Sequence, residues 1–362
     1  MSKRSTLTHA PLRGDEAELF RLHYTRRPLA LLTVPPGRPR PPVQLTKRKL
    51  DCVGPTALLE GVAMQAVLIR ETGTPEVLHY EEADRPEPGD GEVLIRVHAA
   101  SVNPADWKAR RGLSETRLPA VLGRDVSGTV ELSRADGFAE GDDVFGYVAG
   151  GGYAEFTIAS ASTIARKPPG LSHEQAAALP VAGMTAWQAL FDRGGLERGQ
   201  TGLIAGAAGG VGHLGVQFAK HAGARVIGTG SSRNRDFVLA LGADEYVDYT
   251  EQDVGGAVNA VDVAFDTVGG ATTQSLVPTL RDGGILVTIA NAPPEEAAQA
   301  RGARAELLVM SPNAKQLARI AELVASGEVR VEISEVLPLT EVQRAHELSE
   351  SGHTRGKIVL TV

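Results

Sequence analysis

The chain has 362 residues, enough for about two domains of ordinary size, and 42% of them are hydrophobic. Its net charge of −7 provides no basic surface for nucleic acid and no polybasic membrane anchor. No apolar run approaches the roughly 20 residues that a membrane-spanning helix needs. Cys52 is the only cysteine, which excludes an intramolecular disulfide and a multi-cysteine zinc site. We therefore expect a soluble, cytoplasmic protein with no nucleic-acid or membrane partner.

Residues 1–63 differ in composition from the rest, with 11 Lys and Arg against 5 Asp and Glu. The segment Pro35–Pro42 is too rich in proline to sustain a helix or a sheet. The sequence predicts a disordered extension that is a targeting segment, a plain tail, or an upstream mis-start before Met64. Against targeting, the segment lacks an apolar secretory core and contains Asp15, Glu16 and Glu18.

From Met64 the sequence predicts a small antiparallel β domain, because short β-rich runs follow one another with Pro- and Gly-rich turns between them. Ser172 and Gln175 then form a capping box that predicts the start of a helix. The predicted strands are Met64–Ile69, Glu92–Val97, Ser127–Leu132, Asp143–Tyr147 and Ala154–Ile158.

From Gln200 strands alternate with helices, which predicts a parallel sheet with right-handed crossovers and hence an α/β fold. The predicted strands are Thr201–Ala205, Arg225–Thr229, Val261–Asp266 and Gly284–Ile289, and the predicted helices are Val211–His221, Arg235–Leu241 and Thr272–Leu280.

A glycine-rich turn lies between the first of these strands and the first helix, the context that a dinucleotide-binding motif requires. Gly209 lets the backbone approach a pyrophosphate, and Gly212 lets the helix pack on the strand. A strict motif would have glycine in place of Ala207, and the alternative is a loop that merely packs tightly. We interpret the turn as a dinucleotide site formed by Gly206, Ala208, Gly209, Gly210, Val211 and Gly212.

The end of the second strand favours NADP(H) over NAD(H). No acidic residue lies between Gly206 and Asp236 to accept a hydrogen bond from a ribose 2′-hydroxyl. Instead, Ser231, Ser232 and Arg233 offer hydroxyls and a guanidinium suited to a 2′-phosphate. The alternative is an ordinary solvated turn with helix-capping serines.

Several segments together resemble the medium-chain dehydrogenase/reductase superfamily, and most of all its zinc-free branch of quinone oxidoreductases and alkenal (enone) reductases, which includes zeta-crystallin. The resemblance covers Met64–Val362. It implies a GroES-like domain formed by residues 64–184 and 312–362, and an NADP-binding Rossmann domain formed by residues 185–311. The matching segments are Val102–Lys108, Pro119–Gly128, Leu179–Trp187, Ala205–Lys220, Asp266–Gly270 and Arg355–Leu360.

The resemblance also implies cofactor contacts and an oligomeric state. Tyr249 is one of the implied cofactor contacts, and the alternative is that it is a half-buried tyrosine at a strand end. Relatives commonly form homodimers by joining sheet edges of the Rossmann domain, and Gly284–Ile289 is a plausible edge strand. By motif position the residues that contact NADPH are Thr185, Gly209, Val211, Ser231, Ser232, Arg233, Tyr249, Val268 and Ala290.

No metal site is expected. Zinc-dependent relatives have cysteine at the position of Asn103 and Gly-His-Glu at the position of Gly123–Asp125, and neither ligand type is present. Without a Lewis acid, alcohol oxidation is disfavoured. The expected reaction is hydride transfer to a quinone or an α,β-unsaturated carbonyl compound, whose own carbonyl takes up the charge.

Four residues of the first domain are candidates for the substrate side. Asn103 and Lys108 would stabilise the acceptor oxygen as catalytic residues, although Lys108 is alternatively an exposed helix lysine. Trp107 would form an apolar wall, and Tyr153 would cap the cleft from a glycine-rich loop unless it is a simple turn residue. Two other functions stay open, an enoyl-thioester reductase of a biosynthetic pathway and a non-catalytic NADPH-binding protein.

Overall fold

The computed structural model describes residues 63–362. The predicted N-terminal extension, residues 1–63, lies outside the described residues except for its last residue. Within the described part of the chain, no helix is long and apolar enough to cross a membrane.

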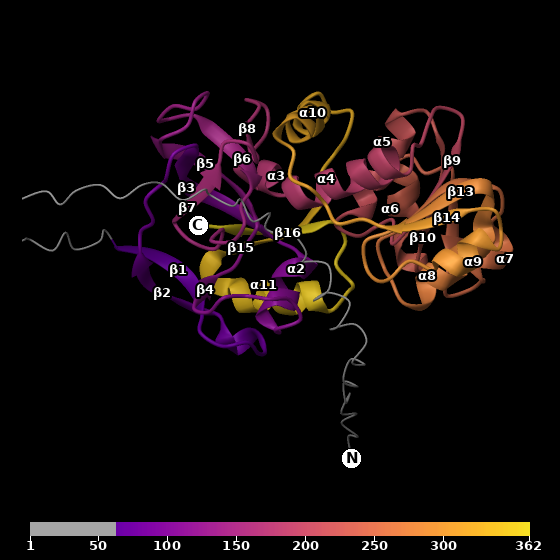
Figure 1. The fold of residues 1–362 in the computed structure, drawn as a ribbon, viewed down its shortest axis with the longest axis horizontal. Helices are drawn as coiled ribbons and strands as arrows, with labels where there is room; N and C mark the ends of the chain where they lie inside the picture. Colours follow the sequence, from indigo (N-terminus) through magenta and orange to yellow (C-terminus); the bar gives the residue numbers. More distant parts are fainter. Residues whose placement is uncertain (1–62) are drawn as a thin grey trace, which may run out of the picture.

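The six-stranded sheet of the second domain is parallel and has helices on both faces (Figure 1). Its strands lie in the order β11-β10-β9-β12-β13-β14, which is the order of the dinucleotide-binding Rossmann fold. The connections diverge between β9 and β12, so a crevice opens at the carboxyl ends of these two strands. The strands are β9 (Thr201–Ala205), β10 (Arg225–Gly230), β11 (Glu245–Asp248), β12 (Val261–Asp266), β13 (Leu280–Thr288) and β14 (Arg304–Leu307), and the helices are α5 (Gly212–His221), α6 (Arg235–Ala240), α7 (Val254–Ala257), α8 (Ala271–Leu276) and α9 (Glu295–Gln299).

Both faces of this sheet are buried, which explains why its strands are continuous apolar runs. In β9, Ile204 packs into the core that contains Leu214 and Phe218 of α5. Its neighbour Leu203 packs into the opposite core, which contains Leu276 of α8. Successive side chains of one strand therefore hold helices on the two sides of the sheet.

The first domain is built around a mixed sheet in the order β15-β16-β3-β5-β6-β8, with β7 also paired to β3, and a small sheet in the order β2-β1-β4. The last strand of the chain, β16, lies antiparallel to β3 and parallel to β15. Strand β16, which follows the Rossmann domain in the sequence, thus belongs to the same sheet as β3, which precedes it. The elements are β1 (Ala63–Ile69), β2 (His79–Asp84), β3 (Glu92–Val102), β4 (Ala120–Val121), β5 (Asp125–Ser133), β6 (Asp143–Tyr147), β7 (Phe156–Ser160), β8 (Ile164–Arg166), β15 (Ile333–Pro338), β16 (Lys357–Thr361), α2 (Pro104–Arg110), α3 (His173–Ala177) and α11 (Val342–Glu350).

Helix α4 (Pro180–Trp187) lies between the two sheets, and α10 (Ala314–Ala325) packs against it (Figure 1). The predicted domain boundary between Met184 and Thr185 falls inside α4, which continues into a π-helical turn over Gln188–Arg193. At this boundary a continuous helix connects the two domains.

Most of the strands and helices predicted between Met64 and Ile289 are confirmed, as is the capping box in which Ser172 Oγ accepts from the Gln175 amide. The predicted helix Thr272–Leu280 is too long: α8 ends at Leu276, and a 3-10 turn containing Pro278 follows. The prediction that Gly284–Ile289 is an edge strand is wrong. It belongs to β13, which lies between β12 and β14, and the edge is the short, charged β14, whose sequence has no strong apolar pattern.

Candidate active site

The glycine turn adopts a shape that only glycine fits at two of its positions. Gly206 has a positive φ of 70°, and a Cβ atom there would lie 2.5 Å from Thr267 Oγ1. A Cβ on Gly212 would lie 2.2 Å from the carbonyl oxygen of Gly206. The N-terminus of α5 is therefore seated directly on the turn, where its partial positive charge favours an anion.

Gly209, by contrast, leaves open space. A Cβ atom at Gly209 would meet only the Gly206 carbonyl oxygen, at 3.3 Å. Ala207, which replaces a motif glycine, is fully buried and its amide donates to the Thr229 carbonyl of β10. Its methyl group thus points into the protein and away from a ligand. Gly209, Gly210 and Val211 line the adjoining cavity, whereas Gly206, Ala208 and Gly212 shape the turn behind it.

His213 supports this turn from the interior. Its Nδ1 lies 2.9 Å from the Gly209 carbonyl oxygen, and its Nε2 accepts from the Glu332 amide at 3.2 Å. This pair of contacts fits a neutral ring that donates through Nδ1. Burial lowers the pKa of His213 to about 4. His213 was not a predicted site residue, and its role in holding the turn is a finding of the structure.

The residues predicted to contact the far end of the cofactor follow the carboxyl ends of neighbouring parallel strands. Arg233 is exposed, and its Nη2 donates to the His353 carbonyl oxygen at 3.2 Å. Arg355, which the sequence did not indicate, donates to the Arg233 carbonyl at 3.2 Å and comes from the first domain. Ser231 and Ser232 follow β10, Tyr249 follows β11, Val268 follows β12 and Ala290 follows β13, and Tyr249 and Val268 are exposed.

The opposite wall of the site comes from the first domain and centres on Asn103, the residue that precedes α2. Its Nδ2 donates to Asp125 Oδ2 at 2.8 Å, and its Oδ1 accepts from Lys357 Nζ at 2.6 Å. Asp125 begins β5 and Lys357 begins β16, so β-sheet pairing with β3 brings both to Asn103. Neither Asp125 nor Lys357 was a predicted site residue.

These polar groups are almost completely buried. Lys357 Nζ also donates to the Val102 carbonyl at 3.2 Å and lies 3.8 Å from Asp125 Oδ2. Asp125 accepts further hydrogen bonds from Ser101 Oγ at 2.9 Å and the Val181 amide at 2.9 Å. Burial lowers the pKa of Lys357 and raises that of Asp125, and their mutual attraction opposes both shifts.

A cavity of about 370 Å³ lies between the two walls. Gly209, Gly210 and Val211 line one side, Asn103, Lys108 and Lys357 line the other, and Thr185 of α4 joins them. Its volume falls in the range of small-molecule sites, about 300–1,000 Å³. The structure thus brings predicted cofactor residues and both predicted catalytic residues to one cavity.

Two predicted substrate residues lie elsewhere. Tyr153 is fully buried in the core of the first domain and its hydroxyl donates to Asp106 at 3.2 Å, so it cannot cap the cleft. The tyrosine anchors the loop because burial of its ring outweighs the flexibility expected from the preceding glycines. Trp107 is not among the residues lining the cavity, although its ring lies 5.8 Å from Lys108 Nζ.

The residues at the former ligand positions do not fit zinc. Arg124 presents a guanidinium, whose Nη1 donates to the Tyr147 hydroxyl at 2.7 Å, and a guanidinium is no metal ligand. Asp125 already accepts from several donors and has the Lys357 ammonium beside it. Among residues 63–362, no cluster of three or more His, Cys, Asp or Glu could hold a metal ion.

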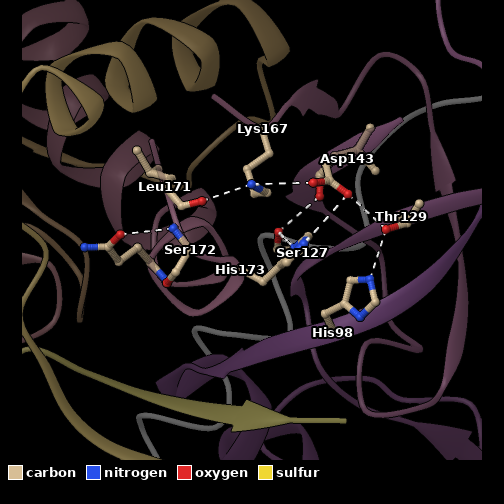
Figure 2. A network of polar contacts seen from close by, with 10 residues as sticks. His98, Ser127, Thr129, Asp143, Lys167, Leu171, Ser172 and His173 are labelled. Carbon is tan, nitrogen blue, oxygen red and sulfur yellow. Dashed lines mark hydrogen bonds and ion pairs between the residues drawn. The ribbon is translucent and has the colours of Figure 1, made fainter. Parts of the chain in front are cut away.

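A second polar network lies on the first domain, and Figure 2 shows it. Ser127 Oγ lies 2.8 Å from His173 Nδ1, whose Nε2 lies 3.8 Å from Asp143 Oδ1. The Ser–His–Asp set is not a nucleophile site, because Ser127 is fully buried and its hydroxyl donates to the Val144 carbonyl. The network fastens α3 to β5 and β6.

Comparisons with known proteins agree with this architecture. Residues 89–169 match the alcohol dehydrogenase GroES-like domain family, and residues 241–360 match the zinc-binding dehydrogenase family. A chloroplast envelope quinone oxidoreductase homolog of Arabidopsis thaliana is 33% identical over 78% of this chain and 93% of its own length. An NADPH-dependent alkenal/one oxidoreductase of the same plant is 32% identical over 82% of this chain and 79% of its own length.

Among solved structures, the quinone oxidoreductase from Coxiella burnetii superposes with a TM-score of 0.80 at 38% identity, covering 83% of this chain and 99% of that one. The strand order, the glycine turn and these similarities together identify the fold and its lineage. The chain belongs to the medium-chain dehydrogenase/reductase superfamily of NAD(P)-binding oxidoreductases, with quinone oxidoreductases and alkenal reductases among its homologues.

Proposed function

We propose that the chain is an NADPH-dependent oxidoreductase that transfers hydride to a quinone or an α,β-unsaturated carbonyl compound without zinc. The composition of the cavity carries this proposal: a backbone-built nucleotide turn faces Asn103 and Lys108, with no metal-ligand set between them. Such an acceptor takes hydride at a soft carbon because its own carbonyl accepts the negative charge. It therefore needs hydrogen-bond donors at its oxygen rather than a Lewis acid.

The residues present fit a dinucleotide. A reduced nicotinamide, when bound, supplies the hydride. Gly209 and the N-terminus of α5 would hold the pyrophosphate, and Thr185 lines the cavity beyond the turn. Ser231, Ser232 and Arg233 would hold a 2′-phosphate, and the lack of an acidic residue at the end of β10 supports NADPH rather than NADH.

On the substrate side, Asn103 and Lys108 would stabilise the charge that develops on the acceptor oxygen. One well-aimed donor of this kind is worth about 10²–10³ in kcat. Lys108 is half-buried and partly screened by water, so we expect it to contribute less than Asn103.

Oxidation of NADPH, monitored against a panel of quinones, enones and enoyl thioesters, tests the proposal. We expect turnover with a quinone or an enone, and slower turnover with NADH. Preference for enoyl thioesters would instead identify a biosynthetic reductase. Tight NADPH binding with no turnover on any acceptor would favour a non-catalytic binding protein.

Exhaustive chelation should leave this activity unchanged, because the former ligand positions hold Asn103, Arg124 and Asp125. Metal analysis of the active protein checks the result. Stoichiometric zinc that is required for turnover would refute the zinc-free mechanism.

We further propose that two chains form a homodimer by joining at β14, the exposed-edge strand of the parallel sheet. Light scattering at working concentration measures this directly. A mass equal to one chain would reject the dimer.

A further inference from the structure

The amide of Asn103 lies between two groups of opposite charge, and their chemistry determines which way it faces. A lysine ammonium can only donate hydrogen bonds, and an ionised carboxylate can only accept them. The amide oxygen must therefore face Lys357, at 2.6 Å, and the amide nitrogen must face Asp125, at 2.8 Å. The opposite orientation would place donor against donor and acceptor against acceptor.

The charge states that this orientation requires are supported by the surrounding groups. Lys357 Nζ donates to the Val102 carbonyl and Asn103 Oδ1, and it lies 3.8 Å from the Asp125 carboxylate, surroundings that favour an ammonium. Three neutral donors and this cation converge on Asp125, which matches a carboxylate. A buried pair of this kind is stable as ions because each group is paired and hydrogen-bonded.

One hydrogen of the Asn103 amide stays available. Nδ2 carries two hydrogens, and within residues 63–362 its one recorded acceptor is Asp125. Asn103 also lines the cavity between the glycine turn and α2. An ammonium on the amide oxygen polarises the amide and makes its remaining N–H a stronger donor.

We propose that Lys357 is a positioning residue for acceptor reduction: its ammonium orients and polarises Asn103 so that the second Nδ2 hydrogen meets the acceptor oxygen. The inference rests on the proposed function and deepens it. Lys357 does not meet the acceptor itself, because its ammonium donates to the Val102 carbonyl and Asn103 Oδ1 and is paired with the Asp125 carboxylate. Without the ammonium the amide is free to turn and present its oxygen, an acceptor, to the developing negative charge.

A double-mutant cycle in the full chain tests this coupling. Lys357→Met keeps the unbranched stem and removes the ammonium. We expect Lys357→Met to lower kcat about 100-fold, as for loss of one oxyanion donor, while the Kd for NADPH stays near wild type. Asn103→Ala should lower kcat similarly, and the double variant should be no slower than Asn103→Ala alone. Equal losses from Lys357→Met in both backgrounds, or no loss in either, would overturn the inference.

Lys167→Met is the matched control. The Lys167 side chain is also largely covered in the first domain, donates to the Leu171 carbonyl at 2.9 Å and lies 3.6 Å from Asp143, but it does not line the cavity. Lys167→Met should lower the unfolding temperature but leave kcat unchanged. If Lys357→Met does not fold, Lys357→Met combined with Asp125→Asn restores the charge balance of the cluster and replaces it in the cycle.

The pH profile provides a readout that a purely structural role would not change. The charged and titratable groups facing Lys357 are Asp125 of β5, Asp106 of α2 and His213 of α5, and Lys108 lines the same cavity. Burial lowers the pKa of Lys357, so wild-type kcat should fall at alkaline pH below the ordinary lysine range. Lys108→Met should keep this alkaline limb, and Asn103→Ala should lose it.

The controls separate this inference from the proposed function. A wild-type protein that reduces no quinone or enone overturns both. An active wild type whose alkaline limb persists in Asn103→Ala, or whose rate is unaffected by Lys357→Met, overturns the role of Lys357 and leaves the proposed function standing.

Discussion

The two walls of the cavity are built by different means. The nucleotide-binding part of the Rossmann wall comes from one run of consecutive residues, Gly206–Gly212. It offers the backbone of Gly209, Gly210 and Val211 and the end of a helix. The first-domain wall presents the side chains of Asn103, at the start of α2, and Lys357 of β16, which are 254 residues apart, with Asp125 of β5 bonded to Asn103. A backbone wall is sensitive to added atoms, whereas a side-chain wall is sensitive to lost charges and to pH.

The largest effect should follow from adding one methyl group to the backbone wall. A Cβ at Gly209 meets only the Gly206 carbonyl at 3.3 Å, so Gly209→Ala should fold. It should nevertheless raise the Kd for NADPH about 100-fold, near the upper end of the roughly 3 kcal/mol that overpacking costs. Calorimetric titration measures the affinity and thermal unfolding measures the fold.

Gly212→Ala is the contrasting variant. Its Cβ would lie 2.2 Å from the Gly206 carbonyl, so it should lose thermal stability even without cofactor. If Gly209→Ala binds NADPH as well as wild type does, the pyrophosphate does not approach this backbone.

The next effect concerns the far end of the nucleotide. Arg233→Glu should weaken NADPH relative to NADH by 10- to 100-fold, because about 1.5–3 kcal/mol of charge-assisted hydrogen bonding is replaced by repulsion. Arg330→Glu is the control, since Arg330 is exposed and lies 5.9 Å from the ring of Phe237, which also faces Arg355. An unchanged cofactor preference in Arg233→Glu would remove Arg233 from the site.

A smaller effect should come from the first-domain wall at Lys108. This side chain is half-buried beside Trp107, so its charge is partly screened. Lys108→Met should lower kcat and kcat/KM together by about 10-fold, with the Kd for NADPH unchanged. Steady-state kinetics with a fixed acceptor measures both constants. A rise in KM alone would mean that Lys108 binds substrate and transition state equally.

The smallest effect at neutral pH should follow from replacing His346 of α11, which lies behind that wall and packs edge-on against Tyr153. The quantity affected is the free energy of unfolding. Burial lowers its pKa to about 3, and neither ring nitrogen has a partner among the described residues. Below pH 6.5, His346 becomes protonated in the unfolded chain but stays neutral in the folded chain. The free energy of unfolding therefore decreases as the pH falls below this value.

His346→Phe should therefore unfold at nearly the same temperature as wild type at pH 7. Below pH 6.5 its free energy of unfolding should exceed that of wild type by a difference that grows by up to about 1.4 kcal/mol per pH unit. Asp106, whose pKa burial raises to about 6, acts with the opposite sign, but it is present in both proteins and cancels in the difference. Denaturant titrations at several pH values measure this difference, and a pH-independent gap would contradict it.

The same contrast explains what the sequence could predict. The parallel sheet and the glycine turn follow from local patterns, because strand, turn and helix are contiguous. Asp125 and Lys357 were missed because their partners are set by strand pairing rather than by spacing. One feature of the sequence could have identified Lys357: it directly precedes the apolar run Ile358–Leu360, and a charge beside a buried strand requires a partner. The prediction that Tyr153 caps the cleft was wrong for the opposite reason. The neighbouring glycines suggested a mobile loop, but the tyrosine ring packs in the core of the first domain.

The place of β16 also constrains the order in which a ribosome-bound chain acquires its structure. The Rossmann strands lie within Thr201–Leu307, so all of them are synthesised before Lys357–Thr361. The first domain, although it begins earlier, lacks its strand between β15 and β3 until Lys357–Thr361 emerges. Domains usually form in the order of synthesis. Here we expect the order to be reversed, with the Ala99–Val102 end of β3 exposing an unpaired edge to chaperones until Lys357–Thr361 has been made.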